Sequence, residues 1–219
     1  MSGCGCEVEI RDRSEMRVLV MLLLINGVMF VLEFAIGWWA QSTALIADAM
    51  DMLADAMVYA VGLYAVGKTV SAKIRAASLS GWLQLGIGLL VLVDVIRRLA
   101  FGSEPVSTLM MIMGLVALLA NTVCLLLISR HRDGEVHMRA SWIFSKNDVI
   151  ANIGVILAGV LVAVTGSRLP DLVIGFVVAM VVVRGGLYIL QDARNEKAEK
   201  GACGSMGSDS NGTYLSASN

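Results

Sequence analysis

Three aspartates lie in one apolar stretch, STALIADAMDMLADAM, which runs from Ser42 to Met57. At about 100° per residue in an α-helix, Asp48, Asp51 and Asp55 fall on a single narrow stripe. An ionised carboxylate at bilayer depth costs about 2.5 to 3.5 kcal/mol, so three on one face need a counter-charge. We expect a divalent cation to supply that charge.

Asp148, in a later apolar stretch, is the natural partner of these acids. Asp51 and Asp55 stand one helical turn apart, and a third carboxylate from a neighbouring helix would give a cation anionic oxygen ligands at about 2.0 to 2.6 Å. Without a cation, such acids would repel one another and take up protons. Cation binding would therefore expel protons, which favours exchange of a metal ion against H⁺.

Asp48 allows two interpretations, because it lies near the outer end of its helix. It is either an acid of an outer vestibule or a hydrogen-bond partner of the preceding span. Other polar side chains in the apolar stretches are expected to join helices through hydrogen bonds, as amides do in membrane bundles. These are Asn26, Gln84, Asn121 and Asn152. Glu33 is interpreted as a helix-packing acid and Asp171 as a first-turn acid of the last span.

The composition predicts an all-α membrane protein. Of 219 residues, 57% are hydrophobic and 16% are charged, and the mean hydropathy is +0.76. Helices of about 20 residues cross the hydrocarbon core of a bilayer, and six such spans are predicted. They cover residues 17–39, 44–66, 78–99, 107–129, 140–165 and 171–190. The first residues lack the features of a signal peptide, so we expect the N-terminus to be retained.

Lysine and arginine define the expected orientation. Twelve of them fall on one side of a six-span chain, whereas Arg97, Arg98 and Arg168 fall on the other. This bias predicts that both termini are cytoplasmic. We expect a cytoplasmic N-terminal segment over 1–16, a six-helix transmembrane domain over 17–192 and a disordered cytoplasmic tail over 193–219. The expected partners are the lipid bilayer and a divalent metal ion, with no nucleic acid.

Two smaller groups of metal-binding side chains lie outside the spans. Cys4 and Cys6 form a CxC pair, which either holds a soft metal transiently or belongs to a flexible reduced terminus. His131 and His137 precede the fifth span, with acidic residues between them. They form either a weak inner access site or a solvated loop.

Two segments carry a resemblance to a known family. Asn26, Glu33 and Gly37 precede STALIADAMDMLAD, which is similar to a family pattern S-x-AL-x-ADA-x-(H/D)-x-x-x-D. The segment RASWIFSKNDVIANIGVI, residues 139–156, is similar to RAAFLHVLGDALGSVGVI, with Asp148 in register. Further agreement comes from Asp94, Arg97, Arg98, Asn121 and Asp171. Over about residues 17–195 the chain resembles the cation diffusion facilitator family of divalent metal exporters.

The resemblance implies a transport site with two ligands from the second span and two from the fifth. They would be Asp51, Asp55 and Asp148, but the remaining family position, usually His or Asp, is Phe144 here. Asn147, Ser145 or water would complete the shell, and Asn147 is the first choice because its amide oxygen is adjacent to Asp148. Asp48 remains a further candidate ligand.

A second departure is Asp51, where zinc-selective members have His. The site then consists of oxygen ligands, which favours hard and borderline ions. The resemblance implies Zn²⁺ as the transported ion, with Mn²⁺, Fe²⁺, Co²⁺ and Cd²⁺ as other candidates and H⁺ as the counter-ion. The implied protein is not an enzyme but a multi-pass membrane antiporter, expected in a bacterial inner membrane, that exports the cation.

The family usually carries a cytoplasmic metal-binding domain after the sixth span, and the resemblance implies a short member without it. A homodimer would then use membrane helices, with Ala158-Gly159 and Gly185-Gly186 as candidate surfaces. The alternative function is a non-transporting metal sensor or an accessory subunit of a full-length exporter. Phe144 and the missing domain are the reasons for that alternative.

Overall fold

A computed structural model describes residues 13–65, 68–129 and 136–209. For residues 13–15, 65, 70, 136–145 and 199–209 it describes the backbone alone. Cys4, Cys6 and His131 lie outside the described residues, and so do the side chains of His137, Phe144 and Ser145. The predictions that concern these groups therefore stay predictions.

The described residues form six helices in an all-α arrangement, as the sequence predicts. They are α1 (Arg13–Trp39), α2 (Thr43–Ala65), α3 (Val70–Phe101), α4 (Ser107–Ser129), α5 (Val136–Thr165) and α6 (Leu169–Asp209). By length and composition, five of these helices can cross a membrane. The remaining helix is α2, in which every window of 18 residues contains Asp48, Asp51 and Asp55. The protein is a multi-pass membrane protein.

Two helices extend further than the hydropathy predicts. α3 begins at Val70, within the connection that was expected to be a loop, and α6 continues to Asp209. The expected disordered tail over 193–219 is therefore helical over 193–209. Its first part, ARNEKAEK, is rich in alanine, glutamate and lysine, which are strong helix formers and continue an existing helix at little cost.

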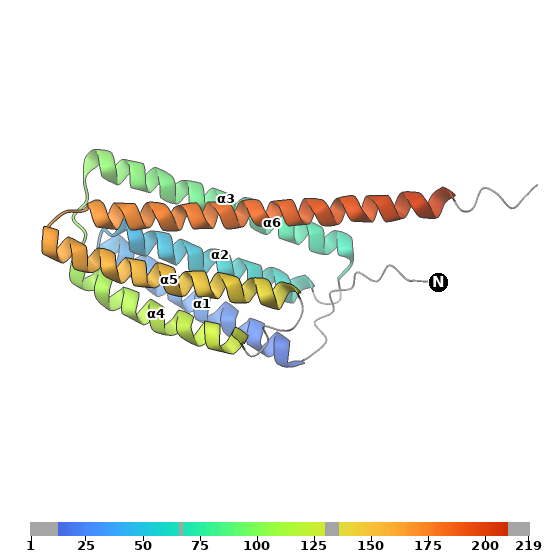
Figure 1. Ribbon diagram of the computed structural model, residues 1–219, viewed down its shortest axis with the longest axis horizontal. Helices are drawn as coiled ribbons and strands as arrows, with labels where there is room; N and C mark the ends of the chain where they lie inside the picture. Colours follow the sequence, from blue (N-terminus) through green and yellow to red (C-terminus); the bar gives the residue numbers. More distant parts are fainter. Residues whose placement is uncertain (1–12, 66–67, 130–135, 210–219) are drawn as a thin grey trace, which may run out of the picture.

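α2 is the centre of the bundle and contacts each of the other five helices. The most extensive helix pairs are α3 with α6, α1 with α2, and α4 with α5. Figure 1 shows α1 beginning and α6 ending at the same end of the bundle, with α6 projecting beyond the other helices. This arrangement agrees with the predicted location of both termini on one side of the membrane.

Glycines bring α3 and α6 close together. A Cβ at Gly81 would lie 2.9 Å from Leu190, and one at Gly88 would lie 2.5 Å from Val183. Gly185 and Gly186 face Gln84 and Leu85 of α3, and Gly159 on α5 faces Met110 and Met111 of α4. The two candidate dimer surfaces are thus covered by helices of the same chain, which removes the reason for assigning them to a dimer contact.

Candidate metal centre

Four of the predicted ligands line one cavity of about 300 Å³ inside the bundle. Asp51 and Asp55 reach it from α2, and Asn147 and Asp148 reach it from α5. Helices α3 and α6 contribute to the walls as well, since Gln84 and Arg184 also line the cavity. The helical spacing within α2 and the pairing with α5 therefore bring these residues together as the sequence predicts.

The acids of this cavity are largely buried and lie close to one another. Asp51 and Asp148 are each 9% exposed. The carboxyl group of Asp148 stands close to those of Asp51 and Asp55, and the Tyr59 hydroxyl donates to Oδ2 of Asp55 at 3.4 Å. In the part of the chain that the structure describes, no group of three Asp, Glu, His or Cys side chains stands in the arrangement of a bound metal ion. The three carboxylates would therefore have to move together to coordinate one cation.

Asp48 lies outside this cavity and belongs to a separate buried network. Its side chain is 1% exposed, and Oδ2 accepts a 2.5 Å hydrogen bond from Nδ2 of Asn152. The amide oxygen of Asn152 in turn accepts a 2.9 Å hydrogen bond from Asn121 on α4. The structure therefore gives Asp48 a buried hydrogen-bonding role and not an exposed position in a vestibule, but its partner belongs to α5, whereas the sequence suggested the preceding span.

Glu33 extends this network to α1. It is fully buried and lies near the Asp48 carboxyl group. Neither carboxyl oxygen of Glu33 has a hydrogen-bond partner among the described residues. Two buried carboxylates near each other repel strongly in a medium of low dielectric constant, which favours a neutral carboxyl group at this position. The predicted role as a helix-packing acid fits this environment.

The position of α2 is fixed by Asp171 from α6. The Asp171 carboxylate accepts hydrogen bonds from the Ser42 hydroxyl at 2.6 Å, the Thr43 backbone amide at 2.7 Å and the Ala44 backbone amide at 3.0 Å. These amides belong to the first turn of α2, which lacks partners within its own helix. Asp171 is a first-turn acid of α6, as the sequence predicts, and its carboxylate in addition caps the acid-bearing helix.

α6 approaches this cap closely. A Cβ at Gly175 would lie 2.8 Å from the Thr43 side chain and 2.9 Å from the Thr43 backbone. Only glycine allows the two helices to meet at this distance. At the same end of the bundle, the buried Arg98 pairs with Asp94 at 2.6 Å and donates to the backbone carbonyl of Gln41, in the α1–α2 turn. Contacts at the start of α2 therefore fix the position of the helix that carries the acids.

Four amides predicted to join helices do so. Asn121 bonds to Asn152, as described above. Nδ2 of Asn26 on α1 donates to the Cys124 sulfur of α4 at 3.8 Å. Gln84 on α3 donates through Nε2 to the Val182 carbonyl of α6 at 3.3 Å. These bonds confirm the predicted interhelical role of all four side chains.

Two further residues of the cavity were not predicted as site residues. Gln84 is 6% exposed, and its oxygen Oε1 has no hydrogen-bond partner among the described residues. The sequence identified Gln84 only as a hydrogen-bond partner. Because its nitrogen makes that bond, its oxygen is left over as a candidate ligand. Arg184 brings a positive charge to the same cavity. An arginine inside an apolar span is costly, and that cost is the signal that would have identified it.

A comparison with known families identifies the family of this chain. A family model described as the cation efflux transmembrane domain matches residues 19–196. The chain belongs to this family. The match extends across all six helices and includes every acid of the cavity. The cation diffusion facilitator resemblance predicted from the two motifs is thereby confirmed.

Curated relatives of this chain are transporters. A zinc transporter, ZitB, from Yersinia pestis is 25% identical over 207 residues, which cover 86% of this chain and 64% of the relative. A cadmium, cobalt and zinc/H⁺-K⁺ antiporter from Bacillus velezensis is 26% identical over 190 residues, which cover 80% of this chain and 60% of the relative. The zinc transporter ttm-1 from Caenorhabditis elegans is 27% identical over 213 residues, which cover 83% of this chain and 52% of the relative.

The chain thus spans less than two thirds of the length of these relatives. The matching part contains the transmembrane domain. Relatives from bacteria such as Yersinia and Bacillus agree with the predicted location of the chain in a bacterial inner membrane.

Proposed function

We propose that this chain exports a divalent metal cation from the cytoplasm in exchange for protons, with zinc as the first candidate ion. The cation would bind to Asp51, Asp55 and Asp148 near the middle of the membrane. The observation that carries the proposal is the single cavity on which these three acids converge from two helices. Binding sites at the middle of a helix bundle are typical of secondary transporters.

The proximity of the acids supports the exchange of a cation for protons. Asp148 stands close to Asp51 and to Asp55, and buried carboxylates this close together take up protons because their like charges repel one another. A divalent cation that binds between them would release these protons, because coordinating carboxylates must be deprotonated. The same residues would then bind either the cargo or the counter-ion, and this competition couples the two fluxes.

Neutral oxygen atoms would complete the coordination of the cation. Asn147 lines the cavity next to Asp148 and is the ligand expected from the sequence. Gln84 is a second candidate, since its Oε1 atom is buried and unpartnered while its nitrogen is held by Val182. Carboxylate and amide oxygens suit zinc and also the other candidates, Mn²⁺, Fe²⁺, Co²⁺ and Cd²⁺. Either amide would replace the ligand that is absent at Phe144.

Arg184 would weaken cation binding. Its side chain lines the acid cavity and a second cavity that Asp51 and Asn147 share. A fixed positive charge near the acids offsets part of their negative charge when no cation is bound, and it repels the cation when one enters. We propose that Arg184 keeps the affinity low enough for the cation to be released on the other side.

Transport by proteoliposomes tests the proposed function. Purified chain is reconstituted with a zinc-sensitive dye and a pH dye inside vesicles that have an acidic lumen. Addition of Zn²⁺ outside is expected to raise the zinc signal and the luminal pH together. Asp148→Asn and Asp55→Asn should abolish both signals, whereas Asp192→Asn, an exposed acid of α6 outside the cavity, should leave them unchanged. Wild-type rates in both cavity variants would remove the proposed site.

A second candidate function is a metal sensor or an accessory subunit that does not transport. The positive charge of Arg184 on the acid cavity favours it, because this charge opposes the cargo. Cation binding without any flux in the wild-type chain would support this alternative. If Phe144→His then created zinc flux, the lack of a metal ligand at position 144 would explain why the wild-type chain does not transport.

A further inference from the structure

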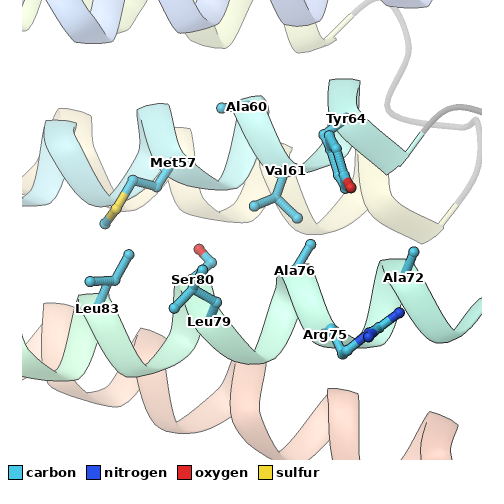
Figure 2. A pocket seen from close by; sticks show the side chains of 10 residues that line it. All are labelled: Met57, Ala60, Val61, Tyr64, Ala72, Arg75, Ala76, Leu79, Ser80 and Leu83. Carbon is cyan, nitrogen blue, oxygen red and sulfur yellow. The ribbon is translucent and has the colours of Figure 1, made fainter. Parts of the chain in front are cut away.

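A second cavity, of about 640 Å³, lies between α2 and α3 and shares no lining residue with the acid cavity. We call it the α2–α3 groove. Its volume is in the range of small-molecule sites, about 300 to 1,000 Å³. Figure 2 shows the ten side chains that line it, none of which is acidic. Tyr64 and Arg75 mark the end of the groove nearest the α2–α3 connection, which is predicted to be cytoplasmic.

Two cations stand at this end of the groove. The Arg75 side chain is held by a 3.3 Å hydrogen bond from Nε to the Ser71 carbonyl, which leaves its two terminal nitrogens available to an anion as far as the described residues are concerned. The Lys68 ammonium lies over the Tyr64 ring, 5.4 Å from the ring centroid. Because no acidic side chain lines the groove, this end favours a negatively charged group.

Ser80 supplies a hydroxyl group in the middle of the groove. It is 4% exposed, and its oxygen has no hydrogen-bond partner among the described residues. The hydroxyls of Thr122 and Thr165 donate to carbonyls of their own helices, those of Leu118 and Leu161, each at 2.6 Å. The Ser80 hydroxyl has no such bond, a property that it shares with the Thr43 hydroxyl at the start of α2. In Figure 2 the Ser80 hydroxyl rises from α3 towards α2, between the two helices. Ser80 is therefore positioned to donate to a ligand in the groove.

The order of these groups along α3 fits one class of ligand. Arg75 and Ser80 are five residues apart, which corresponds to a rise of about 7.5 Å along the helix. Beyond Ser80 the groove is lined by apolar side chains, among them Leu83 of α3 and Met57 of α2. From the cytoplasmic end inwards, the groove thus offers cations, then a hydroxyl donor and then an apolar wall. A phospholipid presents a phosphate, an ester carbonyl and an acyl chain in the same order.

We propose that the α2–α3 groove binds an anionic phospholipid of the cytoplasmic leaflet. Its phosphate contacts Arg75 and Lys68, an ester carbonyl accepts a hydrogen bond from Ser80, and one acyl chain lies along Leu83 and Met57. A net negative headgroup is preferred over a zwitterionic one, because each basic side chain near the membrane surface attracts anionic lipid. This site is independent of the proposed cation transport.

Photo-crosslinking in vesicles tests this lipid site. The full chain is reconstituted into phosphatidylcholine vesicles that carry a small fraction of phosphatidylglycerol with a photoactivatable acyl chain, and crosslinked peptides are mapped. Crosslinks are expected in α2 and α3 at the groove, and unlabelled phosphatidylglycerol should compete for them. Arg75→Gln should reduce them about fivefold, as expected for one basic residue near a membrane surface. Ser80→Ala should also reduce them.

Arg194→Gln is the matched control, because Arg194 is an exposed arginine of α6 that does not line the groove. It should leave the crosslinks unchanged. Three results would overturn the proposal: equal crosslinking by a phosphatidylcholine probe, equal effects of Arg75→Gln and Arg194→Gln, or displacement by inorganic phosphate alone. The first two would mean ordinary lipid contact around the bundle, and the third would mean a site for free phosphate.

Discussion

The side-chain amide of Asn152 on α5 donates a 2.5 Å hydrogen bond to Asp48 on α2. The same side chain accepts a 2.9 Å hydrogen bond from Asn121, so one residue joins three helices. Asn152 lies one helical turn beyond Asp148, on the helix that brings Asp148 to the acid cavity. The approach of Asp148 to Asp51 therefore depends on a buried contact outside the cavity.

Asn152→Ala tests the strength of this contact. The substitution removes the donor to Asp48 and the acceptor for Asn121, and buried polar groups without partners cost about 1 to 3 kcal/mol each. We expect a lower thermal unfolding temperature in detergent micelles. Asn195→Ala, at an exposed position of α6, is the matched control and should unfold at the wild-type temperature. Equal unfolding temperatures for both variants would contradict the proposed importance of the bond.

Asp171→Ala should destabilise the start of α2. The carboxylate accepts hydrogen bonds from two backbone amides and the Ser42 hydroxyl, and loss of such a cap costs about 1 to 3 kcal/mol. We expect a lower unfolding temperature and faster hydrogen exchange of the Thr43 and Ala44 amides. Asp192→Ala places the same change at an exposed position of the same helix and should affect neither measurement. Unchanged exchange at Thr43 would show that another group caps α2.

Local patterns in the sequence were sufficient to predict the helices and to identify the acids of the cavity. The four-residue spacing of Asp51 and Asp55 fixes their common face in any α-helix, and hydropathy identifies the spans around them. The convergence of Asp148 on the same cavity followed from its depth in the fifth span. These features depend on spacing within one helix, which a single sequence contains.

Contacts between distant helices were not predictable in the same way. Asp171 bonds to Ser42 across 129 residues of sequence, whereas its position at the start of α6 indicated only a first-turn acid stabilised by the dipole of its own helix. Gln84 was recognised as a hydrogen-bond partner, but the sequence does not tell which amide atom is used. The end of α6 was placed too early because hydropathy marks the membrane boundary and not the end of the helix.

Cation binding should release protons and should weaken as the pH falls. The buried acids of the cavity stand close together and take up protons because their charges repel one another, and these protons must leave before the carboxylates coordinate a cation. A pH dye in weakly buffered detergent solution should report proton release on addition of Zn²⁺, and titration at lower pH should give a lower affinity. Asp148→Asn should suppress the release, and Asp192→Asn should not. Binding that is independent of pH would contradict the proposed exchange of protons.

Gln84→Leu and Asn147→Leu test which of the two amides completes the coordination shell of the cation. Both side chains line the acid cavity, but only Gln84 has a buried oxygen without a partner among the described residues. We expect Gln84→Leu to lower the Zn²⁺ affinity about tenfold, which corresponds to the loss of about 1.4 kcal/mol. Asn147→Leu should have a smaller effect. Isothermal titration measures both affinities, and the reverse order would assign the ligand to Asn147.

Arg184→Gln should increase the cation affinity. At an effective dielectric constant of about 20, the repulsion between a guanidinium and a divalent cation in one cavity exceeds about 1.4 kcal/mol, so its removal should tighten binding at least about tenfold. Because a tightly held ion leaves slowly, transport in proteoliposomes should become slower at saturating Zn²⁺. Arg194→Gln removes an arginine outside the cavity and should change neither quantity. Weaker binding in Arg184→Gln would mean that the guanidinium supports the acids structurally and does not compete with the cation.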